Sequence, residues 1–414
     1  MIRVSEALKH ILDDVCPLPL EKVPLLEALG RVLGEDIYAP RDIPPKNNSA
    51  MDGYVIRSSD SALATPATPV RLRVADEIPA GVMPGKNLAP GEAARIMTGA
   101  ILPPGGDAVV RCEDVRREGK WIFIFSPYPP EHDVRLAGSD ACCGEVVVPQ
   151  GEVLGPGEIG MIAAVGRSFV FVHQRPTVAV ISTGNELVDV DQAPFPWEII
   201  NVNGYAGISQ ISACGAIPLY MGIARDSKED TAMLFQAASR ADVIMSSGGI
   251  SMGDYDFVKD VILDPGNSLH FRQVAMKPGK PFSYGRIQGK IFFGLPGNPA
   301  SSMISFEQFV RPALLKMMGH TRLFRQTVRA VVEEDIEKKE GMTYFIRARV
   351  EWREGRYHVV TAGGKKTDIL KSMAGVNGLI VLPEKAAILR KGNEATVQLI
   401  DQSFCLTSEP HYLQ

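Results

Sequence analysis

The residue types most able to do chemistry gather at turns in the second half of the chain, each beside a short apolar segment. Glycine, serine, lysine and carboxylate side chains occupy five such turns, at residues 182–186, 225–226, 246–256, 277–281 and 295–299. Glycines let backbone N–H groups approach an anion closely, because they carry no Cβ and tolerate unusual dihedral angles. Lys277 and Lys280 add cationic donors, and a helix that begins after Pro299 adds unsatisfied N–H groups. The combination predicts a site for phosphate or another oxyanion.

Carboxylates stand among these anion-binding residue types. Glu186, Asp226 and Asp256 would repel a bound oxyanion unless a divalent cation lay between them. Hard oxygen ligands beside a phosphate-type site favour Mg²⁺. The pattern therefore predicts a site that takes an oxyanion together with magnesium.

Each turn also has an ordinary structural explanation. A single Gly-Gly pair is usually only a turn, a Lys-Pro-Gly-Lys segment is usually a solvated hairpin, and a glutamate at the position of Glu186 suits the first turn of a helix. The prolines around Gly297 and Asn298 would shape a loop whether or not it binds anything. The functional interpretation rests on the convergence of all five turns at one edge of a sheet.

The elements that must position these turns alternate between strand and helix. Apolar segments predict strands at 178–181, 218–223, 242–245, 269–275 and 290–295, and amphipathic segments predict helices at 199–214, 228–240, 257–263 and 300–318. This alternation is typical of an α/β layered domain with a mainly parallel sheet. Such sheets place ligands at the carboxyl ends of their strands, where the polar turns lie.

The flanking regions have a different rhythm. A helix is expected at 5–15, a short helical stretch at 24–29 and an extended proline-rich segment at 39–46. Short strands are expected at 70–74, 92–97, 108–112 and 121–125, which predicts a compact β-rich domain. Further strands at 327–332, 344–351, 358–361, 378–382 and 394–399 predict a C-terminal β domain or barrel.

Composition excludes several classes of protein. The chain has 414 residues, which is too many for one ordinary core, and a net charge of -4, which argues against a nucleic-acid binder. The most apolar long stretch, 159–172, is broken by Arg167 and too short to span a membrane. No basic segment followed by an apolar block opens the chain, and none of the 6 cysteines forms a CxxC pair. These features predict a cytoplasmic protein without disulfides.

Three polar turns in the β-rich region stand out from their surroundings. They lie at 47–54, 95–100 and 135–140. Taken alone, each is more typical of a turn or a solvated loop than of a site.

With these turns included, the chain resembles the molybdopterin molybdenumtransferases, the MoeA-type family that includes the C-terminal domain of gephyrin. The matching stretches, in the family's order, are NNSAMDGY at 47–54, RIMTGA at 95–100, STGNEL at 182–187, SSGGIS at 246–251, GDYD at 253–256, KPGKPF at 277–282 and GLPGNP at 294–299. The resemblance spans essentially the whole chain. The first two stretches are specific to the multidomain transferase, whereas a small molybdopterin-binding domain alone would explain only the later ones.

The resemblance implies a multidomain α/β plus β fold. An elongated linker and dimerisation domain I would combine residues 1–45 and 141–175, and a β-rich domain II would cover 46–140. A molybdopterin-binding α/β domain III would cover 176–323, and a C-terminal β-barrel domain IV would cover 324–414. Family members are homodimers in which domain II of one protomer faces domain III of the other. Asp52 and Thr98 would then complete the partner's pocket.

The resemblance also implies roles residue by residue. The catalytic residues would be Asp52, Thr98, Asp226, Lys277 and Lys280, and the metal ligands would be Glu186, Asp256 and Asp226. The cofactor-binding residues would be Ser247, Gly248, Gly249, Ser251, Pro296, Gly297, Asn298, Pro299, Arg135, Asp140 and Ser372. The surroundings of Arg135, Asp140 and Ser372 differ from the family pattern. Asn185 stands where many members have aspartate, which removes one candidate ligand and leaves the metal stoichiometry open.

The implied reaction is insertion of molybdate into adenylylated molybdopterin with release of AMP, with Mg²⁺ as cofactor. Its protein partners would be a second copy of the chain, a molybdopterin adenylyltransferase and apo-molybdoenzymes; nucleic acid and membrane are not expected. Molybdate and tungstate are not distinguished, and no role follows for Cys142 and Cys143. Two alternatives stay open: a nucleotide-dependent adenylyltransferase or pyrophosphatase that uses only the α/β domain, and a scaffold that binds a partner without chemistry.

Overall fold

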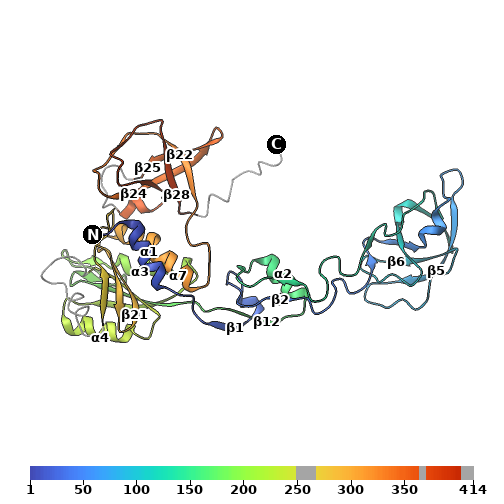
Figure 1. The fold of residues 1–414 in the computed structure, drawn as a ribbon, viewed down its shortest axis with the longest axis horizontal. Coiled ribbons are helices and arrows are strands. Elements are labelled where there is room, and N and C mark those ends of the chain that lie inside the picture. Colours follow the sequence, from blue (N-terminus) through green and yellow to red (C-terminus); the bar gives the residue numbers. More distant parts are fainter. Residues whose placement is uncertain (249–266, 363–369, 402–414) are drawn as a thin grey trace. The chain divides into compact units, whose positions relative to one another are not determined.

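A computed structural model describes residues 1–248, 267–362 and 370–401. The chain folds into two compact units (Figure 1). Unit 1 contains Met1–Glu21, Gly30–Val32 and His173–Gln414, and unit 2 contains Lys22–Leu29 and Leu33–Val172. The chain passes between them along two strands that pair with each other, β1 (Leu20–Pro24) and β12 (Phe169–His173).

A six-stranded sheet forms the centre of unit 1. Its order is β16 (Ile217–Ala224), β13 (Thr177–Thr183), β17 (Val243–Ser247), β21 (Lys290–Leu295), β20 (Ser283–Ile287) and β18 (Ser268–Phe271). The first four strands are parallel, and the last two run antiparallel to their neighbours. The predicted strand–helix alternation with a mainly parallel sheet is confirmed.

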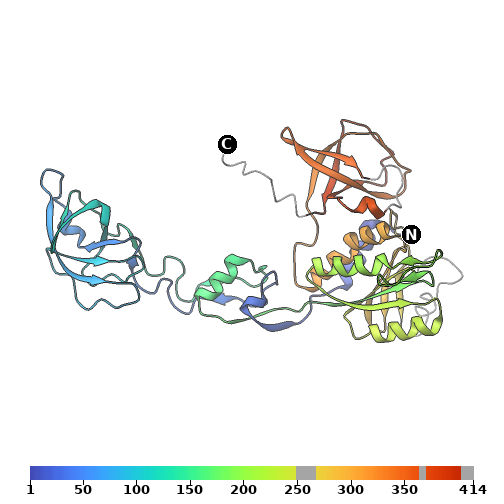
Figure 2. The same ribbon diagram turned by 180° about the vertical axis from the view of Figure 1, so that it is seen from behind.

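Helices cover both faces of this sheet. On one face lie α3 (Val202–Ala213), α1 (Val4–Asp14) and a continuous helical run made of α6 (Pro299–Ser305), a π-helical turn (Phe306–Val310) and α7 (Arg311–Met317); α4 (Lys228–Ala238) lies on the other (Figures 1 and 2). Alternate residues of β13 enter the two cores: Val178 and Val180 join one, while Ala179 and Ile181 join the other. A strand buried on both faces explains why its sequence is continuously apolar.

The helix predicted at 199–214 begins later, because Ile199–Ile200 forms β15 and pairs in parallel with β14 (Leu187–Val188). The buried side chain of Asn201 then caps α3 by accepting a hydrogen bond from the Gly204 N–H at 3.1 Å. The helix predicted at 300–318 is confirmed as one helical run with a π turn inside it. The helix predicted at 257–263 lies outside the described residues.

The register of the sheet brings the polar turns to one edge. Thr183 lies beside Ala224, and Ser182 beside Ser247, which in turn lies beside Leu295, so four strands end together. The antiparallel strand β20 begins at the same edge, where Ser283 pairs with Gly294. The loop between β18 and β20, which carries both predicted lysines, therefore leaves from this edge as well.

A second sheet of unit 1 closes into a C-terminal barrel. Its order is β19 (Met276–Lys277), β24 (Thr343–Arg353), β25 (Arg356–Thr361), β22 (Thr327–Val332), β28 (Glu394–Leu399) and β26 (Gly378–Leu382), and β26 also pairs with β24. Short elements beside it are β23 (Ile336–Glu337), β27 (Ile388–Leu389) and the 3-10 turn η5 (Leu370–Met373). The strand predicted at 269–275 is wrong in its extent, because β18 ends at Phe271, and the next residues to pair, Met276–Lys277, join the barrel sheet.

Unit 2 contains a six-stranded sheet with apolar residues on both faces. Its order is β7 (Ala108–Arg111), β4 (Gly53–Ile56), β6 (Glu92–Ile96), β5 (Val70–Ile78), β9 (Trp121–Ile124) and β8 (Val115–Glu118). Short elements join it: β3 (Asn48–Ser49), β10 (Val134–Arg135), η2 (Ser58–Ser61) and η3 (Cys112–Asp114). This is the β-rich region expected from the sequence.

Unit 2 has a second, smaller core. Side chains of α2 (Pro156–Ala164), β2 (Ile37–Tyr38) and β11 (Val146–Val148) contribute to it. The helix predicted at 24–29 is only a three-residue 3-10 turn, Leu25–Glu27, because Pro24 is extended and the chain reverses at Gly30, where φ is +74°. The four-domain division, with boundaries near 45, 140, 175 and 323, stays a prediction.

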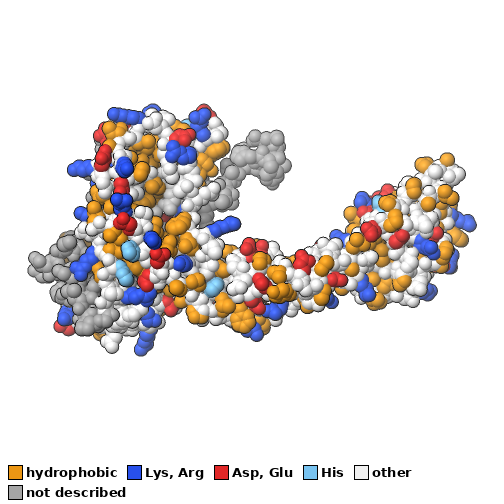
Figure 3. All heavy atoms as spheres, in the orientation of Figure 1, with side chains coloured by type: hydrophobic (Ala, Val, Ile, Leu, Met, Phe, Trp, Pro, Cys, Tyr) orange, Lys and Arg blue, Asp and Glu red, His pale blue; other side chains and the backbone are white. Residues whose placement is uncertain are grey.

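The face drawn in Figure 3 shows no dominance of one charge. Acidic and basic side chains are interspersed over the visible face of each unit in Figure 3. Among the residues that the structure describes, no helix is both long and apolar enough to cross a bilayer.

Candidate functional site

Glu186 lies at the strand-end edge of the α/β sheet, packed over a glycine. Gly184 has φ +149°, and a Cβ built on it would lie 2.6 Å from the Glu186 Oε2. The backbone conformation favours glycine there, and a side chain at this position would displace the carboxylate from over the turn. Glu186 is exposed, so the carboxylate is held beside the strand end and open to solvent.

Asp226 is tied to the same turn through Asn185. The Asn185 N–H donates to the Asp226 Oδ2 at 3.2 Å, and the Asp226 N–H donates to the Asn185 Oδ1 at 3.0 Å. The Arg225 guanidinium donates to the Asn185 carbonyl at 3.1 Å. The turns after β13 and β16 therefore form one hydrogen-bonded unit with the carboxylates of Glu186 and Asp226 on adjoining loops. The side-chain amide of Asn185 therefore holds Asp226 in place through its oxygen.

The described part of the Gly-Gly turn contacts two neighbouring strand ends. Gly248 has φ +83°, and its N–H donates to the Leu295 carbonyl at 3.2 Å. The Thr183 hydroxyl donates to the carbonyl of the buried Ser247 at 3.3 Å. A Cβ built on Gly297 would lie 3.8 Å from the Gly248 Cα. Gly248 thus joins the ends of β13, β17 and β21, and its own N–H is already bonded to protein.

The PGNP segment begins a helix at this edge. Asn298 accepts hydrogen bonds from the Ser301 N–H at 3.0 Å and the Ser301 hydroxyl at 3.1 Å, and Pro299 occupies the first helical turn. Pro296 is buried, and the Gly297 carbonyl accepts from the Asn203 Nδ2 at 2.8 Å. The start of α6 is therefore fixed against the start of α3.

The two predicted lysines lie on the loop between β18 and β20. The Lys277 ammonium stands 5.5 Å from the centre of the Tyr344 ring, and Lys338 stands 4.9 Å from the same ring. Lys280 is exposed, while its carbonyl accepts from Val274 N–H at 3.0 Å. The sequence placed Lys277 after a strand of the α/β sheet, whereas the structure places it in β19, on the edge of the barrel sheet.

A hydrogen-bonded chain behind the strand ends was not found from the sequence. The Ser247 hydroxyl donates to Ser182 at 3.4 Å, and Ser182 donates to the Asn201 Oδ1 at 2.8 Å. The Asn201 Nδ2 donates to the Tyr220 hydroxyl at 3.0 Å, which donates to the Asp189 carboxylate at 2.9 Å. The residues that bond to one another in it are 19 to 65 positions apart in the sequence, so no local motif reveals them.

Asp189 is the last residue of this hydrogen-bonded chain and lies at the surface. The Tyr205 hydroxyl donates to its Oδ1 at 2.5 Å. This hydrogen bond, with those from the Val190 N–H and Tyr220, lowers the pKa of Asp189. The same bond to Asp189, followed by burial, raises the pKa of Tyr205 to about 12. Asp189 therefore stays ionised and fixes the start of the loop that follows β14.

In unit 2, Asp52 and Thr98 are brought together. The Asp52 Oδ1 accepts from the Thr98 N–H at 2.7 Å and from the Thr98 hydroxyl at 2.8 Å. The backbone bond, and then the hydroxyl bond, lower the pKa of Asp52. Both residues are exposed, so the structure offers an ionised, oriented carboxylate at the surface of this unit.

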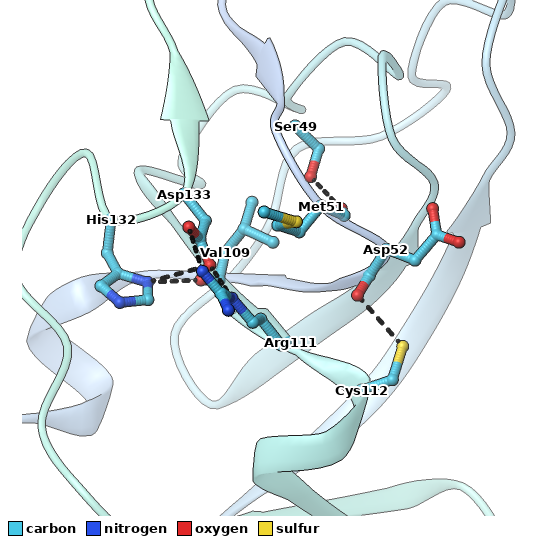
Figure 4. A network of polar contacts seen from close by, with 8 residues as sticks. All are labelled: Ser49, Met51, Asp52, Val109, Arg111, Cys112, His132 and Asp133. Atoms are coloured by element: carbon cyan, nitrogen blue, oxygen red, sulfur yellow. Dashed lines mark hydrogen bonds and ion pairs between the residues drawn. The ribbon is translucent and has the colours of Figure 1, made fainter. Parts of the chain in front are cut away.

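A frame of contacts holds the segment that carries Asp52 (Figure 4). The Arg111 guanidinium donates to both oxygens of Asp133, at 2.8 and 3.3 Å, and the Asp133 carbonyl accepts from the Ala50 N–H at 2.9 Å. The Cys112 thiol donates to the Asp52 carbonyl at 3.2 Å. Gly53 is obligatory, because a Cβ there would lie 2.1 Å from the Val110 carbonyl oxygen.

Arg95 contacts two residues next to this frame, Tyr54 and Cys112. Its guanidinium lies 5.2 Å from the centre of the Tyr54 ring and donates a hydrogen bond to the Cys112 sulfur. Burial lowers the pKa of Arg95, but the contacts with Cys112 and Tyr54 together outweigh burial, so the pKa is raised. The RIMTGA segment therefore supplies both a carboxylate clamp, Thr98, and a cation beneath the Asp52 loop.

The remaining predicted residues are less closely joined. Arg135 and Asp140 are exposed in unit 2, with Arg135 paired to Asn48 through the β10–β3 ladder. Ser372 belongs to η5 beside the barrel. Gly249, Ser251 and Asp256 lie outside the described residues. Within the part of the chain that the structure describes, no group of three or more His, Cys, Asp or Glu side chains has the geometry of a metal site.

Family models cover most of the chain. The MoeA N-terminal region (domains I and II) matches residues 2–166, a probable molybdopterin binding domain matches residues 179–316, and the MoeA C-terminal region (domain IV) matches residues 329–400.

Relatives match over nearly their full length. A molybdopterin molybdenumtransferase of Nostoc sp. is 37% identical over 385 residues, 91% of this chain and 88% of its own length. One from Staphylococcus aureus (strain MSSA476) is 33% identical over 404 residues, 97% of this chain and 96% of its own. A crystal structure of the molybdopterin biosynthesis MoeA protein from Pyrococcus horikoshii is 31% identical and superposes with a TM-score of 0.82 over 97% of this chain and 100% of that one. The predicted fold class is confirmed, and the chain belongs to the molybdopterin molybdenumtransferase (MoeA) family.

Proposed function

We propose that this chain is a magnesium-dependent molybdopterin molybdenumtransferase that inserts molybdate into adenylylated molybdopterin and releases AMP. The observation that carries the proposal is the meeting of strand ends in unit 1. There the Glu186 and Asp226 turns are hydrogen-bonded together, and the Gly248 turn contacts the PGNP segment. Family membership supports the same reaction.

The donor chemistry at this edge fits a divalent cation. Glu186 and Asp226 present carboxylate oxygens from adjoining turns, and such oxygens are what Mg²⁺ prefers. Asp256, the third proposed ligand, follows β17 in the sequence, outside the described residues. When bound, Mg²⁺ would neutralise charge on the phosphoanhydride that is cleaved.

The chain's own residues bind and orient the substrate. Lys277 and Lys280 would attract its phosphates, and the start of α6 with Ser372 would attract molybdate, a dianion that requires N–H and O–H donors. Asp52, kept ionised by Thr98, would orient or activate a reacting group. Because these groups hold the reactants and offset their charge, most of the rate enhancement would come from positioning and electrostatics.

The proposed assembly is a cytoplasmic homodimer in which Asp52 and Thr98 of one protomer serve the Glu186 turn of the other. Its substrate would come from an enzyme that adenylylates molybdopterin, and its product would pass to apo-molybdoenzymes. Apolar side chains exposed on β12, Phe169 at 46% and Phe171 at 41%, are available for self-association.

The test is incubation with adenylylated molybdopterin, Mg²⁺ and molybdate, followed by measurement of AMP and reconstitution of an apo-molybdoenzyme. Wild type should release AMP and restore activity, and Glu186→Gln should do neither while staying folded. ATP turnover without adenylylated molybdopterin would favour an adenylyltransferase or pyrophosphatase. If the protein is folded but releases no AMP, the result would favour a scaffold function without chemistry.

A further inference from the structure

The loop between β14 and β15 presents two aromatic rings to solvent. Phe195 and Trp197 are 60% and 72% exposed, and their rings stack with centroids 5.1 Å apart and planes 7° apart. Two parallel rings held together in this way present a flat apolar surface. Exposed aromatic pairs of this kind suit the stacking of another planar ring.

The loop is held by hydrogen bonds along its length. Asp189, fixed by two tyrosine hydroxyls, begins it, and the Gln192 N–H donates to the Asp189 carbonyl at 3.1 Å. The Phe195 N–H donates to the Glu198 carboxylate at 2.9 Å, and the Glu198 N–H donates back to the Phe195 carbonyl at 2.9 Å. These bonds order the backbone that carries the two rings, and the rings stack on each other, so stacking a ligand on them requires less ordering than on a loose loop.

Both ends of the loop lead into the candidate site. The Ile199 N–H, two residues after Trp197, donates to the Glu186 carbonyl at 2.8 Å. Past Ile200 the chain enters α3, where Asn203 holds the Gly297 carbonyl at 2.8 Å. The segment that follows the aromatic pair thus contacts two of the strand-end turns at which the substrate is expected.

The loop that carries the aromatic pair and the loop that carries the lysines differ in charge. Glu186, Glu198, Asp189 and Asp191 all lie on or beside the aromatic loop, so a phosphate without a bound cation is disfavoured there. The lysines of residues 277–280 lie on a different loop. An uncharged ring at the end of a phosphorylated substrate fits this arrangement.

We propose that Phe195 and Trp197 form the stacking site for an uncharged fused heteroaromatic ring of the substrate. The identity of the ring, pterin or adenine, rests on the proposed function. Stacking of a base on an aromatic side chain contributes enough affinity that losing it weakens binding by roughly tenfold.

The experiment uses the full-length chain with Trp197 as its only tryptophan. Trp121 and Trp352 are the other two of its 3 tryptophans, and both are replaced by phenylalanine. AMP and a simple pterin are titrated separately, and Trp197 fluorescence reports stacking. Trp197→Ala in the wild-type background should raise the Kd of the bound probe roughly tenfold, and Trp197→Phe should restore most of the affinity. Trp352→Ala is the matched control, because Trp352 is 61% exposed and lies on the barrel.

Quenching by AMP alone assigns adenine to the site, and quenching by the pterin alone assigns pterin; either result supports the inference. If neither probe quenches or loses affinity on Trp197→Ala while wild type releases AMP, the inference is overturned and the proposed function stands. If a probe stacks but wild type releases no AMP, the ring site stands and the proposed reaction does not. If Trp197→Ala dissociates dimers and leaves both Kd values unchanged, the pair is a self-association contact, and the inference is wrong.

Discussion

Gly248→Ala tests whether the meeting of strand ends is a rigid structure. The new Cβ would lie 2.7 Å from the Thr183 carbonyl oxygen and 2.9 Å from its Oγ1, at a residue with φ +83°. The left-handed backbone costs an L-residue about 1–2 kcal/mol. The steric overlap of the new Cβ with Thr183 should destabilise the folded state by about 1–3 kcal/mol more. Strand β13 is paired on both sides, so the Thr183 carbonyl cannot move freely out of the way.

The matched control is Gly297→Ala, in the adjoining turn. Its Cβ would have only the Gly248 Cα nearby, at 3.8 Å, so a change within about 0.5 kcal/mol is expected. The two costs together are about 2–5 kcal/mol, so at roughly 2–4 °C per kcal/mol for a domain of this size Gly248→Ala should lower the calorimetric Tm of unit 1 by about 4–20 °C. AMP release should fall with it, because the ends of β13, β17 and β21 shift together. If the two variants have equal Tm values and equal AMP release, the ends of β13, β17 and β21 are not held rigidly together at Gly248.

Further predictions concern single groups. Thr98→Val removes one of two hydrogen bonds to Asp52, so the pKa of Asp52 should rise and the acid limb of the AMP-release profile should move to higher pH; an unmoved profile contradicts that role. Burial, and then the charge of Arg311, lower the pKa of His320 below 6.5, so the unfolded chain binds more protons and stability should fall as pH drops below about 6.5. His320→Asn should reduce the pH dependence of the free energy of unfolding, measured by denaturant titration. An unchanged pH dependence would mean that other groups cause it. Asp52→Asn and Glu186→Gln, each inactive alone, should regain about a quarter of wild-type AMP release when co-expressed if the dimer shares its sites; no recovery in a purified mixed dimer argues for sites within one protomer.

Much of unit 1 follows from its sequence, because continuous apolar segments predict strands buried on both faces. The carboxyl ends of parallel strands then collect the polar turns at one edge, as the register of Ser182, Ser247 and Leu295 shows. The boundaries of helix 199–214 were less predictable. Whether Ile199 and Ile200 start a helix or pair with β14 depends on a neighbour that is distant in sequence.

Contacts between residues that are close in sequence are the easiest part of the candidate site to anticipate. Glu186 over Gly184 and the Asn298 cap are local arrangements. The hydrogen-bonded chain from Ser247 to Asp189 joins residues of three strands with Asn201 and Asp189 of the connecting segments, so only the folded sheet brings it together. Roles for the individual side chains stay predictions that the experiments above test.

The two-residue strand β19 has a consequence for how the protein can be dissected. Met276 and Lys277 belong by sequence to the α/β segment, yet they pair with Thr343 and Tyr344 of the barrel. A truncation that ends before residue 327 would leave β19 without its hydrogen-bonding neighbour and Lys277 without the Tyr344 ring. A shortened protein lacking the barrel would therefore carry a damaged lysine loop, and a chimera with a relative's barrel should transfer residues 276–277 and 343–344 as a matched set.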